Sequence, residues 1–301
     1  MSDRHQPVRP DATDVTVVLP AYNEAGHIRA EVERISAALK DSPYSFEILV
    51  VDDGSTDGTA DLVEGMPFVT VKRFPTNRGS GTARRVGTAE AHGRWVVWTD
   101  ADMTYPNERI PEFIDVLRRG GAEQVVGART SEQGTLKPLR VPAKWAIRRL
   151  AEFLTSATIP DLNSGLRAFS KETAKPYLGL LPAGFSCVTT ITLAFLANGH
   201  LVEYVPIDYH PRAGRSHFHP LKDAYRYILQ VVRMVTFFEP LRVFAPIALA
   251  LMGFGGIKFI YDLIVHPFRV ATNTVLLILT GLILFSFGLL ADLVVRTNRS
   301  E

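Results

Sequence analysis

The stretch Val97-Trp98-Thr99-Asp100-Ala101-Asp102-Met103 joins a short apolar run to two carboxylates that a single residue separates. Apolar residues followed by polar turn residues predict a buried strand that ends at Thr99. Side chains alternate along a strand, but the backbone bends beyond its end, so Asp100 and Asp102 can converge on one cation. Carboxylate oxygens suit Mg²⁺ or Mn²⁺, and these ions in turn hold diphosphates. Turns and helix caps use the same pattern, so the surrounding sequence has to decide between the two interpretations.

Strands and helices alternate on both sides of this stretch. Apolar runs predict strands over residues 15–19, 46–51, 69–72, 95–99, 124–127 and 201–207. Helical spacing predicts helices over residues 23–39, 58–63, 80–91, 110–118 and 187–197. Such alternation predicts an α/β fold with a mainly parallel sheet and helices on both faces. Because parallel strands end at one edge of the sheet, we expect the loops after Leu19, Val51 and Thr99 to share that edge.

The composition excludes several other classes of protein. The chain has 301 residues, of which 47% are apolar, and a formal net charge of +2. This charge, without a basic stripe in the α/β part, argues against a nucleic-acid-binding protein. The single cysteine, Cys187, excludes an internal disulfide framework and fits a reducing compartment. The polar N-terminus lacks the apolar core of a signal peptide, so we expect the α/β part to remain in the cytoplasm.

Two uncharged runs, Val243–Ile257 and Val275–Ala291, mark the C-terminal part. A helix needs about 20 apolar residues to cross a bilayer, and flanking residues extend each run to that length. Lys258 and Asp262 can place their charged ends at an interface. A pair of buried helices in a soluble protein is the alternative, but the second run is apolar all round, which favours the bilayer. The short link His266–Thr274 predicts a hairpin, and flanking arginines mark the side of its two ends as cytoplasmic.

A basic amphipathic pattern precedes the hairpin. Apolar residues recur at helical spacing from Leu221 to Phe238, with Lys222, Arg226 and Arg233 elsewhere on the surface. Such a helix suits the surface of an anionic leaflet, although an ordinary packed surface helix has the same periodicity.

Five motifs carry a resemblance to a known family. In chain order they are Val17-Val-Leu-Pro-Ala-Tyr-Asn-Glu24, Val50-Val-Asp-Asp-Gly-Ser-Thr-Asp-Gly-Thr59, Asn77-Arg-Gly79, Asp100-Ala-Asp102 and Asp161-Leu-Asn-Ser-Gly-Leu-Arg167. Together they resemble the family-two glycosyltransferases of GT-A fold, and most closely the dolichol-phosphate-mannose-synthase-like group. That group glycosylates polyprenyl phosphates. The resemblance covers about residues 15–240, and the two C-terminal runs resemble the membrane spans of bacterial and archaeal polyprenyl-phosphate glycosyltransferases.

The resemblance and the hydropathy pattern together predict five segments. They are a polar tail (1–14), a GT-A catalytic domain (15–219), an amphipathic interfacial helix (220–240), a transmembrane hairpin (241–296) and a cytoplasmic tail (297–301). We therefore expect a cell-membrane protein with two spans and a cytoplasmic catalytic domain. Whether the chain forms a homo-oligomer is left open.

The resemblance implies a donor site at the predicted sheet edge. Pro20, Tyr22 and Glu24 would line a nucleoside pocket, and Asp53 would accept a hydrogen bond from the base or ribose. Helix capping and turn formation are the alternative roles of Glu24 and Asp53. In the family such pockets accept uracil or guanine, so the resemblance implies GDP-mannose or a UDP-hexose as the donor.

The remaining donor contacts are implied for the diphosphate and the sugar. Asp100 and Asp102 would bind Mg²⁺ or Mn²⁺, and Thr104 stands where the family often has a third ligand. Ser164 and Arg167 would shape the floor of the site near the sugar. Arg212 and Ser216 match the family's diphosphate-binding loop, and His217 takes the place of its lysine.

The family's general base is missing. Transfer to a hydroxyl needs an Asp or Glu on the helix after the Gly-Phe segment, and Gly184–Thr192 contains neither. A phosphate acceptor is already ionised and needs cations instead. Arg129 and Arg148 match the family's acceptor-phosphate arginines, although surface ion pairing is the alternative. The sequence thus predicts an inverting, metal-dependent transferase that glycosylates a polyprenyl or dolichyl phosphate. A hydroxyl-specific transferase with Asp161 as base, or a silent membrane-tethered nucleotide-sugar binder, are the alternatives.

Overall fold

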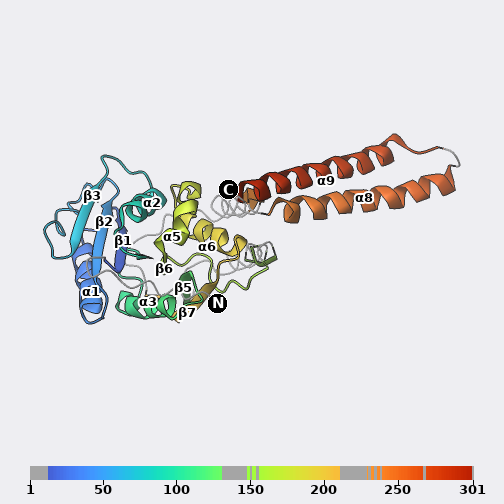
Figure 1. Cartoon of the computed structure of the whole chain (residues 1–301). Helices are drawn as coiled ribbons and strands as arrows, with labels where there is room; N and C mark the ends of the chain where they lie inside the picture. Colours follow the sequence, from blue (N-terminus) through green and yellow to red (C-terminus); the bar gives the residue numbers. More distant parts are fainter. Residues whose placement is uncertain are drawn as a thin grey trace. The chain divides into compact units, whose positions relative to one another are not determined.

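The computed structural model describes residues 13–130, 148–149, 151–153, 156–210, 229, 232–233, 236–237, 239–266 and 269–299. The chain divides into two compact units (Figure 1). The first comprises Met1–Lys144 and Thr158–Asp223, and the second comprises Trp145–Ala157 and Ala224–Glu301. The segment with Arg148 therefore belongs to the unit of the C-terminal hairpin.

A seven-stranded sheet forms the centre of the first unit, in the order β3-β2-β1-β4-β6-β5-β7. The strands are β1 (Val15–Ala21), β2 (Phe46–Asp52), β3 (Val69–Arg73), β4 (Trp95–Trp98), β5 (Gln124–Arg129), β6 (Arg167–Ser170) and β7 (Val202–Ile207). β6 is antiparallel to both of its neighbours, whereas the other paired strands are parallel. The predicted α/β fold with a mainly parallel sheet is confirmed.

Helices cover both faces of this sheet. Successive apolar side chains of its strands point to opposite faces, so both faces are apolar. The helical segments are α1 (Ile28–Lys40), α2 (Ser80–Glu90), η1 (Asn107–Arg109), α3 (Ile110–Arg119), α5 (Lys171–Ala174), η2 (Lys175–Leu180) and α6 (Cys187–Ala197). Val17 and Leu19 of β1 pack in the cluster with α1 and α3, and Val18 packs in the cluster with α2 and α6. Figure 1 shows helices on the two faces of the sheet.

The strand register brings the predicted loops to one edge. Ala21 of β1 is opposite Asp52 of β2, and Val18 of β1 is opposite Trp98 of β4. Since these strands are parallel, the loops that follow β1, β2 and β4 leave the sheet on the same side, as the sequence predicts.

Three local predictions differ from the structure. The predicted helix over 58–63 is a series of turns, because Gly58 has a φ of +82° and Asp57 instead holds the N–H of Thr59. The helix predicted to begin near residue 23 begins at Ile28. β6 was not predicted, since its short Arg167-Ala-Phe-Ser170 run contains a buried arginine rather than a continuous apolar stretch.

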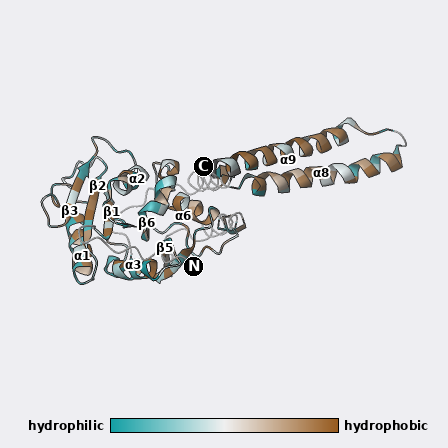
Figure 2. Ribbon diagram, viewed as in Figure 1, coloured by the Kyte–Doolittle hydropathy of each residue, from teal (hydrophilic) through white to brown (hydrophobic). Residues whose placement is uncertain are grey.

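The second unit contains two long apolar helices, α8 (Pro240–Val265) and α9 (Thr272–Arg299). Both are long and apolar enough to cross a membrane (Figure 2). At most 17% of the residues in the apolar window of either helix are buried, which a core helix of a soluble protein would exceed. The helices pack closely at glycines, since a Cβ on Gly281 would lie 2.6 Å from Met252 Cγ. The predicted interfacial helix over 220–240 falls largely outside the described residues.

Candidate active site

Hydrogen bonds join the loop after β1 to the loop after β2. The N–H of Asn23 donates to Ser55 Oγ at 2.9 Å, and the N–H of Thr56 donates to Asn23 Oδ1 at 2.9 Å. The N–H of Glu24 donates to Thr59 Oγ1 at 2.8 Å. Asn23 reaches this geometry with a φ of +55°, a conformation that asparagine tolerates better than most residues. The predicted nucleoside loop is thus fixed to the Asp-Asp-Gly-Ser loop.

The predicted nucleoside residues are accessible at this edge. Tyr22 is 48% exposed, so part of its aromatic side chain is available to a ligand. Pro20 and Glu24 are half-buried beside it. Their contact with a nucleoside stays a prediction, and their placement on one loop is compatible with it.

Asp53 has a structural task in addition to its predicted one. Its carboxylate is only 3% exposed, and it accepts hydrogen bonds from the N–H of Arg78 at 2.7 Å and of Gly79 at 2.8 Å. Each oxygen therefore holds the backbone that leads into α2. A hydrogen bond to a base or ribose would have to be added to these two, so this role of Asp53 stays a prediction.

The glycine pattern before α2 serves packing. The N–H of Gly81 donates to the carbonyl of Ala183 at 2.7 Å, and a Cβ on Gly81 would lie 2.7 Å from the carbonyl of Gly184. A Cβ on Gly79 would meet Ala183 as well. These glycines let the segment before α6 approach α2, and they leave the amide of Gly81 bound to protein rather than to a phosphate.

Asp100 forms an ion pair with Arg84 of α2. Arg84 Nη2 lies 2.5 Å from Asp100 Oδ1, and the arginine side chain is 1% exposed whereas that of Asp100 is 28% exposed. The guanidinium also lies over the ring of Trp98 at 5.8 Å from its centroid. Sequence reasoning missed this role of Arg84. The one available signal was a basic residue on the apolar side of a predicted helix.

Asp102 is oriented by Thr104. The threonine hydroxyl donates to Asp102 Oδ1 at 2.6 Å, and its N–H lies 3.3 Å from the same oxygen. Thr104 is fully buried, and Asp102 is 7% exposed. The residue at the family's third-ligand position thus acts as a hydrogen-bond donor to the second aspartate.

The loop before β6 closes one side of the acidic pair. A Cβ on Gly165 would lie 2.7 Å from Asp100 Oδ2, so glycine is required for this approach. The N–H of Gly165 donates to the hydroxyl of Tyr105 at 2.6 Å. Burial beside the charge of Asp100 raises the pKa of Tyr105, which keeps this hydroxyl neutral.

Ser164 and Arg167 support this loop from inside. Both are fully buried, and the hydroxyl of Ser164 has no hydrogen-bond partner among the described residues. Arg167 donates to the carbonyls of Ser164 and Val188 and, at 2.7 Å, to Thr192 Oγ1. Burial lowers the pKa of Arg167 to about 10. The two residues fit the predicted floor of the site, but Arg167 is directed at protein carbonyls rather than at solvent.

The donor set at the acidic pair fits a hard divalent cation. Mg²⁺ commonly uses one or two carboxylates together with water and phosphate oxygens. Asp100 and Asp102 supply such a pair, and Ser164, whose hydroxyl is unpaired among the described residues, directly precedes Gly165 in the chain. Among the described residues, no group of three or more His, Cys, Asp or Glu side chains could hold a metal.

Arg129 forms a bidentate ion pair with Asp161. Its Nε and Nη2 lie 2.6 and 3.0 Å from the two carboxylate oxygens. Burial alone would raise the pKa of Asp161, but the hydrogen bonds and charge of Arg129 hold that pKa below its usual range. Asp161 is therefore a poor general base, which weakens the one base that the sequence offered for a hydroxyl acceptor.

Three other residues, Arg148, Arg212 and Ser216, are predicted to bind phosphate groups. Arg148 is 43% exposed, and its Nε lies 3.9 Å from Glu152 Oε1 within the second unit. This is the surface ion pair that the sequence offered as an alternative. Arg212 and Ser216 lie outside the described residues.

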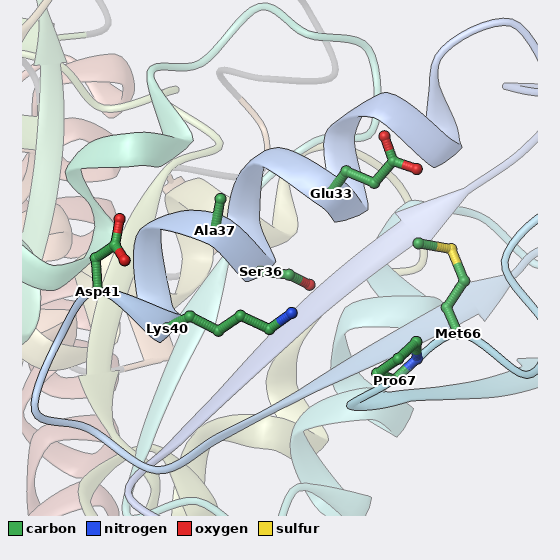
Figure 3. A pocket seen from close by; sticks show the side chains of 7 residues that line it. All are labelled: Glu33, Ser36, Ala37, Lys40, Asp41, Met66 and Pro67. Atoms are coloured by element: carbon green, nitrogen blue, oxygen red, sulfur yellow. The ribbon is translucent and has the colours of Figure 1, made fainter.

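A cavity of about 450 Å³ lies beside α1 (Figure 3). It is lined by Glu33, Ser36, Ala37, Lys40, Asp41, Met66 and Pro67. None of these is a predicted site residue, and the acidic pair is not part of its lining.

Comparison with known proteins identifies matches to both units. Residues 16–177 match the family described as Glycosyl transferase family 2, and residues 239–296 match the GtrB C-terminal hairpin. The dolichyl-phosphate hexose transferase of Haloferax volcanii is 31% identical over 211 residues, which are 69% of this chain and 87% of that protein. The low-salt glycan biosynthesis hexosyltransferase Agl6 of the same organism is 28% identical over 223 residues, which are 72% of this chain. The chain spans about half of the length of Agl6, namely 52%.

The fold is also found among solved structures. Glucosyl-3-phosphoglycerate synthase from Mycobacterium tuberculosis, in complex with Mn²⁺, UDP-glucose and phosphoglyceric acid, aligns with a TM-score of 0.60 at 22% identity. The alignment covers 74% of this chain and 80% of that one. The likeness shows a GT-A-like α/β fold, as the sequence predicts.

Proposed function

Since the chain belongs to glycosyl transferase family 2, we propose that it transfers a sugar from a nucleotide-diphosphate sugar to a polyprenyl phosphate at a membrane. The assignment of a phosphate as the acceptor rests on one observation, the ion pairing of Asp161. Its bidentate ion pair with Arg129 disfavours it as a base, and α6 contains no carboxylate. An acceptor that is already ionised needs no base at this position.

The donor would bind along the carboxyl edge of the sheet. Tyr22 offers a ring face to the base, and Asp100 and Asp102 would hold a divalent cation against the diphosphate. Bound Mg²⁺ or Mn²⁺ would supply positive charge for the departing diphosphate. The Mn²⁺ in the structurally similar synthase supports this choice of metal class. The donor is GDP-mannose or a UDP-hexose.

Transfer would proceed by one inverting displacement. An oxygen of the lipid phosphate attacks C1 of the sugar, and the bond between C1 and the donor's β-phosphate oxygen breaks. The electron pair of that bond leaves with the nucleoside diphosphate, and no proton has to be removed. Arg129 is the arginine of the first unit that we assign to the acceptor phosphate, and the role of Arg148 in the second unit stays a prediction.

The hairpin supports a membrane location. α8 and α9 have apolar stretches long enough to cross a bilayer, and a relative with 31% identity is named dolichyl-phosphate hexose transferase. We place the catalytic unit on the cytoplasmic side, because Arg242 and Arg299 flank the two ends of the hairpin.

The test uses purified full-length protein, a polyprenyl phosphate and a panel of labelled UDP- and GDP-sugars. We expect an acid-labile glycolipid that requires a divalent metal and disappears in Asp102→Ala. Equal product formation in the presence of EDTA would refute the metal role. Transfer only to glycans or lipids with a free hydroxyl would refute the acceptor class. Nucleotide-sugar binding without turnover on any acceptor would indicate a silent binder.

A further inference from the structure

A buried carboxylate, Glu31 of α1, lies behind the loop that carries Asp100 and Asp102. Its side chain is fully buried. Burial raises the pKa of Glu31, although hydrogen bonds from Asn107 and Arg34 act in the opposite direction. A buried carboxylate is unfavourable unless polar partners surround it, so these partners show what the group does.

The partners of Glu31 reach both ends of the acidic loop. Asn107 Nδ2 donates to Glu31 Oε1 at 2.7 Å, and Asn107 Oδ1 accepts from Thr99 Oγ1 at 2.7 Å. The backbone N–H of Met103 lies near this carboxylate and acts to lower its pKa. Thr99 directly precedes the acidic pair and Met103 directly follows it. One carboxylate is therefore connected to both sides of the pair.

Arg34 connects Glu31 to a third part of the acidic loop, the backbone of Tyr105. Its Nη2 lies 2.7 and 3.0 Å from the two oxygens of Glu31, and it donates to the carbonyl of Tyr105 at 2.5 Å. The hydroxyl of Tyr105 in turn accepts from the N–H of Gly165, which packs on Asp100. The side chain of Arg34 is 23% exposed, so solvent screens this ion pair only in part.

The backbone of the loop needs such support. Met103 has a φ of +62°, which few residues other than glycine adopt. Unfavourable backbone conformations persist only where the surroundings hold them, and Glu31 lies beside the N–H of Met103. Thr104 follows directly and orients Asp102 through its hydroxyl. The conformation at Met103 thus decides where the second aspartate points.

We propose that Glu31 is a positioning residue that holds Asp100 and Asp102 in the geometry for a divalent cation. The inference rests on the metal role in the proposed function. Glu31 also connects the metal loop to the nucleoside loop, because α1 begins where the N–H of Ile28 donates to the carbonyl of Glu24. The same helix therefore carries the nucleoside loop at its start and the support of the acidic pair one turn later.

The test measures Mn²⁺ binding directly, by electron paramagnetic resonance of full-length protein with UDP or GDP and without an acceptor. We expect Glu31→Gln to weaken Mn²⁺ binding at least tenfold, because an amide cannot accept from all of these donors. Thr99→Val should weaken it about threefold or more, whereas Thr99→Ser, which keeps the hydroxyl, should bind as the wild type does. Glu33→Gln is the matched control on α1. Glu33 is exposed and 3.8 Å from Arg29, and it lines the cavity in Figure 3.

The outcomes separate this inference from the proposed function. If the wild type binds Mn²⁺ and the Glu31→Gln and Thr99→Val variants, with unchanged melting, bind it equally well, Glu31 has no positioning role. If the wild type binds no Mn²⁺ with either nucleotide, the metal role itself is wrong and the inference falls with it. If Glu31→Gln does not fold, the comparison of Thr99→Val with Thr99→Ser decides. Restoration of turnover in these variants by excess Mn²⁺ would support positioning over a general loss of structure.

Discussion

The substitution Asp53→Asn tests whether Asp53 stabilises the backbone that leads into α2. In the wild type, the two carboxylate oxygens accept from the N–H groups of Arg78 and Gly79 at 2.7 and 2.8 Å. Asparagine has the same shape but only one oxygen, and its NH₂ group would face one of these N–H groups. The substitution therefore removes one acceptor and leaves a donor without a partner in a site that is 3% exposed.

The expected loss of stability follows from these two hydrogen bonds. A hydrogen bond to a charged group contributes about 1.5–3 kcal/mol, and a buried donor left unsatisfied costs about 1–3 kcal/mol. These contributions overlap, so we expect the free energy of unfolding to fall by about 2–4 kcal/mol. For a domain of this size, each kcal/mol corresponds to about 2–4 °C, so Tm should fall by roughly 4–16 °C.

Thermal unfolding followed by tryptophan fluorescence measures this change. Trp95 and Trp98 of β4 are buried and report on the first unit. Asp61→Asn is the control, because the Asp61 side chain is 67% exposed and pairs with Arg73 on the surface. Its effect should stay within about 0.5 kcal/mol. If Asp53→Asn melted with the wild type and only weakened nucleotide binding, the structural role of Asp53 would be refuted.

Three further predictions follow from the geometry. Gly165→Ala should lower the apparent Mn²⁺ affinity about tenfold in the same resonance assay, because its Cβ would lie 2.7 Å from Asp100 Oδ2 and overpacking costs about 1–3 kcal/mol; unchanged affinity would contradict this. Asp161 has a folded-state pKa below that of the unfolded chain, so its contribution to stability is complete above about pH 5 and is lost as pH falls through the folded pKa. Asp161→Asn should abolish this acid-dependent loss in pH-dependent unfolding and cost about 3–5 kcal/mol at pH 7, and an unaltered acid limb would refute the assignment. Gly281→Leu should loosen the hairpin, measured as reduced cross-linking between cysteines placed on α8 and α9, whereas Gly253→Leu, with open space around it, should not.

The sequence alone was sufficient to predict the strands that carry the site. β1, β2 and β4 are apolar runs that end in polar turn residues, and both signals are local in the chain. Parallel pairing then placed their loops at one edge, so the nearness of Glu24, Asp53 and Asp100 to that edge could be predicted. The predicted helix over 58–63 failed because Asp57 and Gly58 make hydrogen bonds and backbone turns that helical spacing does not reveal.

The supporting residues of the site could not be predicted, because their roles depend on distant partners. Arg84 lies 16 positions from Asp100 in the chain, and Asn107 lies 76 positions from Glu31. A buried charge on an amphipathic helix is visible only as an exception to the apolar pattern. The pairing of Arg129 with Asp161 is of the same kind, and it changes the interpretation of both residues.

Helix α2 is connected to both parts of the predicted donor site, the part for the nucleoside and the part for the diphosphate. Asp53 fixes the backbone of Gly79 just before this helix, and Arg84, one turn inside it, pairs with Asp100. The loop after β2 and the loop after β4 are thus attached to one short rigid element. Asp53 and Asp100 are therefore both bonded to the segment 78–84, and Glu31 of α1 supports the loop of the second aspartate through Asn107 and Thr99. In the proposed function, α1, which follows the loop after β1, and α2, which follows β3, would position the base and the diphosphate.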